Sequence, residues 1–152
     1  MAGLREDYEA WWDSLRPAMA QTVRHVLGGA ANPTTLTSHD WLMPEKVVTA
    51  WHQNHIRRGD LKNGPWAVDV AQKGLYEISL YRWAPYLDKA MEMKSARLRV
   101  GDFEVAKDLA AGATKASFLV KLKKGPAMLQ TWLERPNGDS SGAYYLKVRH
   151  IR

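Results

Sequence analysis

Apolar and polar residues alternate along much of the chain, and this pattern predicts an all-β protein. The alternation is clearest in two segments, 66–70 and 75–83, which flank the polar pair Lys73-Gly74. Because successive side chains of a strand point to opposite faces, a period of two marks one apolar face. That face is formed by Trp66, Val68, Val70, Tyr76, Ile78 and Leu80. We therefore expect these two segments to pair as an antiparallel hairpin.

Similar short segments recur along the chain, separated by turn residues such as Gly101-Asp102, Lys124-Gly125 and Asn137-Gly138. The expected strands cover residues 22–27, 34–38, 66–70, 75–83, 96–100, 103–107, 115–122, 126–134 and 143–150. Many short strands at this spacing are typical of a sandwich of two sheets. The predicted fold class is mainly β, an antiparallel, jelly-roll-like β-sandwich with one N-terminal α-helix.

The start of the chain has the period of a helix rather than that of a strand. Residues 4–19 carry an apolar stripe formed by Leu4, Tyr8, Trp11, Trp12 and Leu15. We expect an N-terminal helix within residues 1–20 and a sandwich domain over residues 21–152. Two tryptophans on so short a helix need a partner, most simply the sandwich itself. The alternative is an exposed patch or a homodimer formed through this helix.

The amino-acid composition limits the classes of partner that this chain is expected to bind. The 22 basic and 16 acidic residues give a net charge of +6, and the basic residues are scattered rather than clustered. We expect an anionic or sulfated sugar as partner and no nucleic acid, because no nucleic-acid reading motif accompanies the charge. The chain has no cysteine, which excludes disulfides and thiolate chemistry. No segment resembles a signal peptide or a membrane span, so we expect a soluble, cytoplasmic chain and no membrane partner.

Residues 39–64 lack a regular period, and we interpret them as a long functional loop. Aromatic rings offer a flat face to the C–H groups of a sugar, and planar polar side chains select its hydroxyls. Arg57 and Arg58 would add bidentate recognition of sulfate or carboxylate. The candidate ligand-binding residues, which we expect to meet at one end of the sandwich, are Trp41, Trp51, Gln53, Arg57, Arg58, Trp66, Tyr81, Arg82 and Trp83. Alternatively, the tryptophans cap the sandwich as local core and the arginines pair with acids.

Arg82 carries a signal of its own. Continued alternation after Leu80 places Arg82 on the apolar face of its strand, with Tyr81 and Trp83 on the other face. A strand with a purely structural task rarely has a charge on its core face. Either a ligand is bound here or neighbouring groups hold the charge.

Catalysis and metal binding have weaker signals. The candidate catalytic residues are His39, Asp40 and His55, because a histidine in a charged loop titrates in the range that proton transfer needs. No activated nucleophile accompanies them. His52 and His55 are three residues apart, but such spacing brings ligands together only on a helical backbone. We therefore expect no metal and no cofactor.

Several motifs, taken in order, carry a family resemblance. They are Leu4 to Trp12, Thr37-Ser38-His39-Asp40-Trp41, Ile56-Arg57-Arg58-Gly59, the segment 63–83 and Gly142-Ala143-Tyr144-Tyr145. Their combination resembles the C-terminal region of bacterial arylsulfatases of the type abundant in planctomycetes. The resemblance implies a β-sandwich appended to a sulfatase catalytic domain, with the N-terminal helix as the closing element of that domain. It also implies a periplasmic or secreted parent protein.

The same resemblance limits the chemistry. The family's nucleophile is made from a Cys or Ser in a Cys/Ser-x-Pro-x-Arg motif, which this chain lacks. The expected function is therefore a non-catalytic accessory domain that binds anionic or sulfated glycans. Two alternatives stay open. One is a small enzyme, a hydrolase or another promiscuous activity, that uses a Trp/His/Arg loop pocket, and the other is a structural dimerisation domain.

Overall fold

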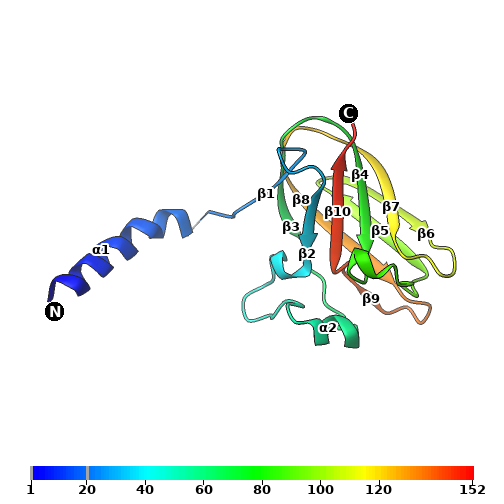
Figure 1. The fold of residues 1–152 in the computed structure, drawn as a ribbon, viewed down its shortest axis with the longest axis horizontal. Helices are drawn as coiled ribbons and strands as arrows, with labels where there is room; N and C mark the ends of the chain where they lie inside the picture. Colours follow the sequence, from blue (N-terminus) through cyan, green and yellow to red (C-terminus); the bar gives the residue numbers. More distant parts are fainter. Residues whose placement is uncertain (1, 20) are drawn as a thin grey trace.

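The computed structural model describes residues 2–19 and 21–152, and it shows two packed β-sheets with a helix extending from one side (Figure 1). The order of elements is α1 (Ala2–Met19), β1 (His25–Leu27), β2 (Thr34–Thr37), the 3-10 helix η1 (Ser38–Asp40), α2 (Gln53–Arg58), β3 (Trp66–Val70), β4 (Gly74–Tyr81), the 3-10 helix η2 (Pro85–Leu87), β5 (Ser95–Val100), β6 (Phe103–Asp108), β7 (Ala116–Leu122), β8 (Gly125–Glu134), β9 (Ser140–Ser141) and β10 (Tyr145–His150).

The strands form a six-stranded and a four-stranded sheet. The first has the order β1-β3-β8-β5-β6, with β9 paired to β8, and the second has the order β2-β10-β4-β7. Every pair is antiparallel except β1 with β3, which is parallel. The prediction of a mainly β, antiparallel sandwich with an N-terminal helix is confirmed.

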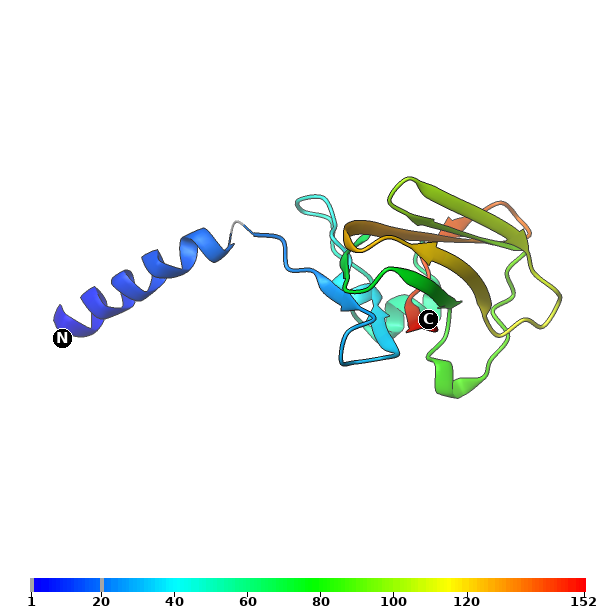
Figure 2. The ribbon, with the colours of Figure 1, turned by 90° about the horizontal axis from the view of Figure 1, so that it is seen from above.

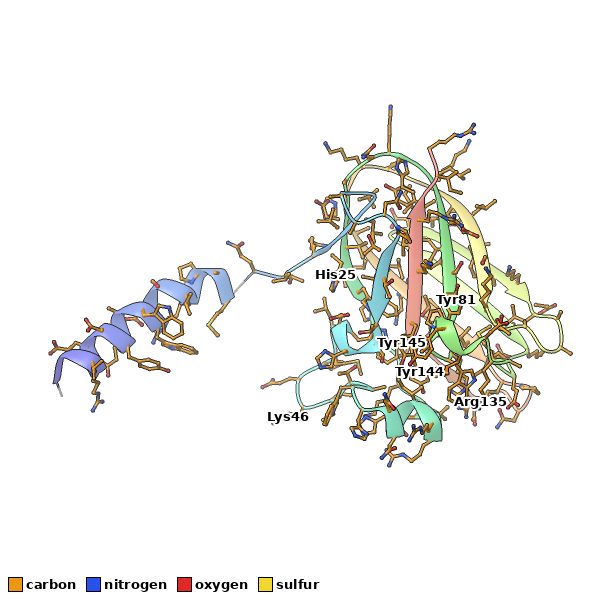
Figure 3. All side chains as sticks on the ribbon, viewed as in Figure 1. His25, Lys46, Tyr81, Arg135, Tyr144 and Tyr145 are labelled. Carbon is orange, nitrogen blue, oxygen red and sulfur yellow. The ribbon has the colours of Figure 1, made fainter. Side chains whose placement is uncertain are left out.

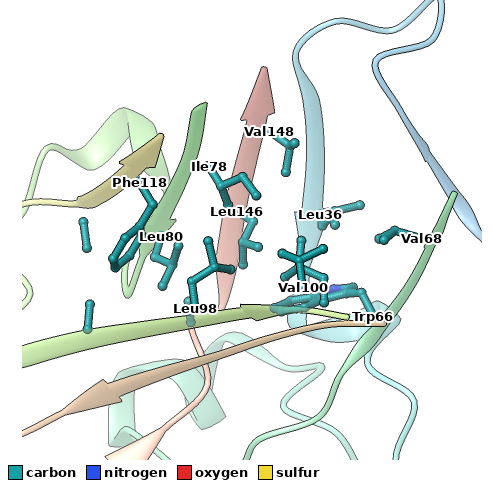
Figure 4. Packing of buried hydrophobic residues seen from close by; sticks show 14 of the residues in the cluster. Leu36, Trp66, Val68, Ile78, Leu80, Leu98, Val100, Phe118, Leu146 and Val148 are labelled. Carbon is teal, nitrogen blue, oxygen red and sulfur yellow. The ribbon is translucent and has the colours of Figure 1, made fainter. Parts of the chain in front are cut away.

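The core lies between the two sheets and is built by the predicted alternation. Figure 4 shows the side chains of both sheets pointing into the space between them. The four-stranded sheet contributes Leu36, Ile78, Leu80, Leu146 and Val148, and the six-stranded sheet contributes Trp66, Val68, Leu98 and Val100, none more than 6% exposed. Full burial of one such aliphatic side chain contributes about 1.5–3 kcal/mol. The alternation thus locates the core-facing residues correctly.

The predicted hairpin is wrong. β3 pairs with β1 and β8 in the six-stranded sheet, whereas β4 pairs with β10 and β7 in the four-stranded sheet. The connection at residues 71–73 therefore crosses from one sheet to the other, and the hydroxyl of Tyr76 donates to the carbonyl of Gln72 at 2.6 Å. The alternation of apolar and polar residues predicts which face of a strand is apolar, but it does not predict which other strand it pairs with. Here the two apolar faces bury each other across the sandwich.

The helix α1 does not pack on the sandwich, contrary to the simplest expectation. Figure 2 shows it standing away from both sheets. Trp11 is 55% exposed and Trp12 is 38% exposed. Their rings contact each other and Tyr8, with Tyr8 stacked on Trp12 at a centroid distance of 6.5 Å. The expected exposed patch is therefore present, while homodimerisation stays a prediction. No helix in the described residues is long and apolar enough to cross a membrane.

Deletion of residues 1–20 is expected to leave the free energy of unfolding of the sandwich unchanged within about 0.5 kcal/mol, because α1 covers no core residue. Urea unfolding of dilute protein, followed by circular dichroism, measures this. As a contrast, Leu146→Ala should lower the same free energy by about 2–5 kcal/mol, since it opens a cavity in the core. A clear loss of stability in the deletion variant would contradict the independence of the two parts.

Candidate functional site

One end of the sandwich gathers α2, η2 and the start of β10. In Figure 1, α2 lies beyond the ends of β2 and β10. Figure 3 shows Tyr144 and Tyr145 at the start of β10, and Arg135, which follows β8, at the same end. Three of the nine predicted ligand-binding residues, Gln53, Arg57 and Arg58, lie on α2, and the predicted residues do not form a single pocket.

The ends of α2 are fixed by local hydrogen bonds. The N–H of Asn54 donates to Nδ1 of His52 at 3.1 Å, and the N–H of His52 donates to Nδ1 of His55 at 3.4 Å. This is the reciprocal arrangement of a helix N-cap. Gly59 ends the helix with φ 72° and ψ 48°, a left-handed conformation that glycine adopts without a Cβ clash. The expectation of an irregular loop throughout residues 39–64 is therefore corrected, since six helical residues are too few to show a period.

A cleft with a volume of about 480 Å³ lies between α2, the segment 83–89 and β10. We name it the aromatic cleft. Its lining residues are Gln53, Ile56, Arg57, Trp83, Ala84, Tyr86, Leu87, Lys89 and Tyr145. Tyr86 is 84% exposed, whereas Trp83 and Tyr145 are half-buried. The Nε1–H of Trp83 donates to the carbonyl of Ala90 at 3.0 Å, which fixes the indole.

The polar side chains of this cleft are cationic or neutral. Arg57 donates to the amide oxygen of Gln53 at 3.4 Å, and Nζ of Lys89 lies 4.0 Å from the centroid of the Trp83 ring. No acid is among the lining residues, so the local potential favours an anionic ligand. Burial raises the pKa of Tyr145, which keeps its hydroxyl protonated and able to donate.

The structure separates the adjacent arginines that we expected to act together. Arg57 lines the aromatic cleft, while Arg58 faces a second cleft together with Arg82 and Arg135. Arg58 donates two hydrogen bonds to the carboxylate of Asp60, each 3.3 Å long. The alternative that arginines pair with acids therefore holds for Arg58. Arg82 is buried, as the alternation of its strand predicts.

Two of the predicted ligand residues are core residues instead. Trp66 is fully buried and donates its Nε1–H to the carbonyl of Thr37 at 2.7 Å. Trp41 is 5% exposed and packs against Trp66 and Tyr144, with centroids 5.6 Å and 6.0 Å away. Neither indole offers a face to a ligand, which corrects our expectation. These two rings cap the core, as the alternative interpretation proposed.

The remaining ligand candidates lie outside the aromatic cleft. Trp51 is 56% exposed, and its ring meets the edges of His52 and His55 at centroid distances of 5.5 Å and 5.8 Å. Tyr81 ends β4, where it is half-buried opposite Tyr145. Neither residue lines the aromatic cleft, although Tyr81 meets Trp83 in a much smaller neighbouring hollow.

Two of the three catalytic candidates, Asp40 and His55, have local structural partners. The carboxylate of Asp40 accepts from the backbone N–H of Thr37 at 3.3 Å and from its hydroxyl at 3.0 Å, so it caps η1. His39 is exposed beside it, and His55 caps α2. In the part of the chain that the structure describes, no hydrogen bond links these residues to one another. Residues 2–19 and 21–152, which the structure describes, contain no group of three or more His, Cys, Asp or Glu side chains that could hold a metal ion.

Sequence reasoning missed the aromatic contributions of Tyr86 and Tyr145 and the charge of Lys89. Tyr86 and Lys89 follow the end of β4, and Tyr145 begins β10, so only the fold brings them together. The aromatic run Trp83-Ala84-Pro85-Tyr86 was the available signal, because a proline between aromatic residues indicates an exposed turn.

A further aromatic residue, Trp132, lies on the outer face of the six-stranded sheet. The guanidinium of Arg97 lies 3.8 Å from its ring centroid, and that of Arg99 lies 5.3 Å away. Because these cations already cover the ring, Trp132 offers less free aromatic surface than Tyr86 does. The aromatic cleft is therefore the better candidate for a ligand site.

Comparisons with known proteins show the fold. No family model and no curated protein matches the chain. A family 35 carbohydrate-binding module from Clostridium thermocellum matches with a TM-score of 0.50 and 18% identity, over 80% of this chain and 100% of the module. A ruminal GH26 endo-beta-1,4-mannanase matches with a TM-score of 0.46 and 14% identity, over 79% of this chain and 26% of the mannanase. The chain therefore has a β-sandwich fold similar to that of a carbohydrate-binding module.

We expect the substitution Arg58→Gln to raise the pKa of Asp60 toward its ordinary value. In the intact protein this pKa is lowered, chiefly by the hydrogen bond from Arg58. A depressed carboxyl pKa stabilises the folded state above the unfolded pKa, and this stabilisation is lost as the pH falls through the folded pKa. The variant should therefore lose less stability on acidification.

Titration of the Asp60 carboxyl carbon by NMR measures the shift directly. Arg57→Gln, one residue earlier on α2, is the matched control and should leave the Asp60 pKa unchanged. An Asp60 pKa that is the same in Arg58→Gln and in the parent protein would show that the Arg58 contact is absent in solution.

Proposed function

We propose that this protein is a glycan-binding accessory domain whose ligand occupies the aromatic cleft. The observation that carries the proposal is the arrangement of Trp83, Tyr86 and Tyr145 around one hollow, with Gln53 and Arg57 on α2. Aromatic faces contact the C–H groups of a sugar ring, while amide and guanidinium groups bond its hydroxyls. The similarity of the fold to a carbohydrate-binding module supports this proposal.

We further propose that the glycan is anionic, and that sulfate groups on it are preferred. Arg57 and Lys89 supply positive charge in a cleft whose lining contains no acid. Lys89 now lies over the Trp83 ring, and a sugar stacked there would displace it toward the substituents of that sugar. A guanidinium and an ammonium group suit a sulfate or carboxylate better than a hydroxyl.

The relation to arylsulfatases stays a proposal that rests on the sequence motifs. In that setting the domain would hold a sulfated glycan for a catalytic domain carried by the same protein. The chain itself has neither a cysteine nor a Ser-x-Pro-x-Arg motif. Among the described residues, no hydrogen bond links His39, Asp40 and His55, so the geometry supports binding rather than the enzymatic alternative.

The expected effect of Tyr86→Ala is a loss of affinity, by about tenfold, for a sulfated oligosaccharide and for its desulfated analogue, because the most exposed aromatic face is removed. Arg57→Gln should weaken binding of the sulfated form alone. Isothermal titration calorimetry measures both, after a glycan array has selected the oligosaccharide. The control is Tyr8→Ala, which removes a tyrosine that is 56% exposed on α1. Equal affinities in the two tyrosine variants would rule out the aromatic cleft as the binding site.

Self-association through α1 is a second, independent proposal, supported by the exposed stripe of Tyr8, Trp11 and Trp12. We expect sedimentation velocity to detect a dimer at high protein concentration. The double substitution of Trp11→Ala and Trp12→Ala should abolish this dimer, whereas Trp51→Ala, which removes an equally exposed indole at the far end, should not. A monomer at every concentration would refute the proposal.

A further inference from the structure

Arg82 is a buried cation without an acidic partner among the residues that the structure describes. Only 8% of the Arg82 surface is exposed to solvent. One terminal nitrogen, Nη2, donates to the carbonyl of Ile56 at 3.3 Å, while the other, Nη1, is buried and has no hydrogen-bond partner. The faces of Trp83 and Tyr144 lie 4.6 Å and 5.8 Å from the guanidinium. Burying a charge without a counterion is unfavourable, so such a group needs an explanation.

A second guanidinium approaches the same point. A Cβ atom built on Gly59 would lie 2.8 Å from Nη2 of Arg82, and it would lie closer still to Nη2 of Arg135. Arg135 also donates to the carbonyl of Gly59 at 2.8 Å. Burial lowers the pKa of Arg82, and the neighbouring charge of Arg135 lowers it further, whereas Tyr144 and the charge of Glu92 act in the opposite direction. Two like charges held together oppose folding unless an anion offsets them.

Both side chains contribute to the wall of one cleft. They line a cleft with a volume of about 360 Å³, which we name the arginine cleft. Its lining residues are Arg58, Arg82, Met91, Glu92, Met93, Arg135, Pro136 and Asn137. The only acid among them, Glu92, is exposed and makes no ion pair with Arg82. Arg58 is paired with Asp60, and Nη1 of Arg135 lies 3.7 Å from the carboxylate of Asp139. Among the described residues, Arg82 is therefore the arginine of this cleft that has no carboxylate partner.

We propose that the arginine cleft is an oxyanion site, which takes the carboxylate or sulfate group of an acidic sugar, with Arg82 and Arg135 as direct donors. Planar guanidinium groups match such anions with paired N–H bonds. Arg58 lies at the same cleft and can release Asp60 to join them. The assignment to a sugar rests on the function proposed above, whereas the oxyanion chemistry does not depend on it.

The first test uses inorganic sulfate, glucuronate and neutral glucose at constant ionic strength, with the arginine Nε–H signals followed by NMR. We expect saturable shifts of the Arg82 and Arg135 signals with sulfate and glucuronate, and none with glucose. Arg135→Gln should weaken anion binding by at least about tenfold. The control Arg149→Gln, which removes an arginine paired with Glu77, should bind as the parent does. Absence of saturation, or equal affinity in Arg135→Gln, would overturn the proposal.

The second test separates a binding role of Arg82 from a structural one. Burying a charge without a counterion is costly, so an apolar side chain of similar size removes an unfavourable contribution to folding. Arg82→Met should therefore keep or raise the melting temperature of the ligand-free protein while abolishing anion binding. A large fall in melting temperature together with retained sulfate binding by the folded fraction would show that Arg82 only supports α2.

The two proposals can fail separately. Tyr86→Ala should lose the oligosaccharide but keep sulfate binding in the arginine cleft. If Tyr86→Ala keeps the oligosaccharide while Arg135→Gln loses sulfate, the aromatic cleft is refuted and the oxyanion site stands. If Arg135→Gln still binds sulfate while Tyr86→Ala no longer binds the oligosaccharide, the oxyanion site is refuted and the aromatic cleft stands.

Discussion

The mutual burial of two apolar strand faces is the constraint on which the rest of this structure depends. Because side chains such as Leu98 and Leu146 fill the space between the sheets, the connecting segments are confined to the ends and edges. At one end, buried polar groups then fix the covering segment. Ser38 donates its hydroxyl to the carbonyl of Ala50 at 2.7 Å, and Tyr144 donates to the carbonyl of Asp60 at 2.6 Å. Both clefts are thus built on a supported surface rather than on a free loop.

The period-two pattern was sufficient to locate nearly all strands, because it follows from the strand backbone itself. It did not identify partners: residues 66–70 and 75–83 were expected to pair with each other, yet they lie in different sheets. Pairing depends on contacts between residues far apart in sequence, which no local pattern encodes. The helix α2 was missed for a different reason, since its six residues are too few to show a helical period.

The candidate site shows where chemical reasoning from sequence succeeds and where burial overrides it. Arg82 was noticeable because a charge interrupted an apolar face, and the structure places it in the interior. Trp66 had conflicting signals, since its strand position indicated core while its ring suggested a sugar platform, and the core position prevailed. Tyr86 had only the local signal of an aromatic turn, and Arg135 had none, because its place in a cleft depends on neighbours supplied by distant segments.

Gly59 joins two requirements at a single position. Its left-handed backbone ends α2, and its lack of a side chain leaves room for the guanidinium groups of Arg82 and Arg135. Even one methyl group would distort the helix terminus and displace both cations at once. A substitution at Gly59 would therefore change the end of α2 and the positions of the two arginines together. We expect neighbouring surface positions to tolerate substitution far better than Gly59 does.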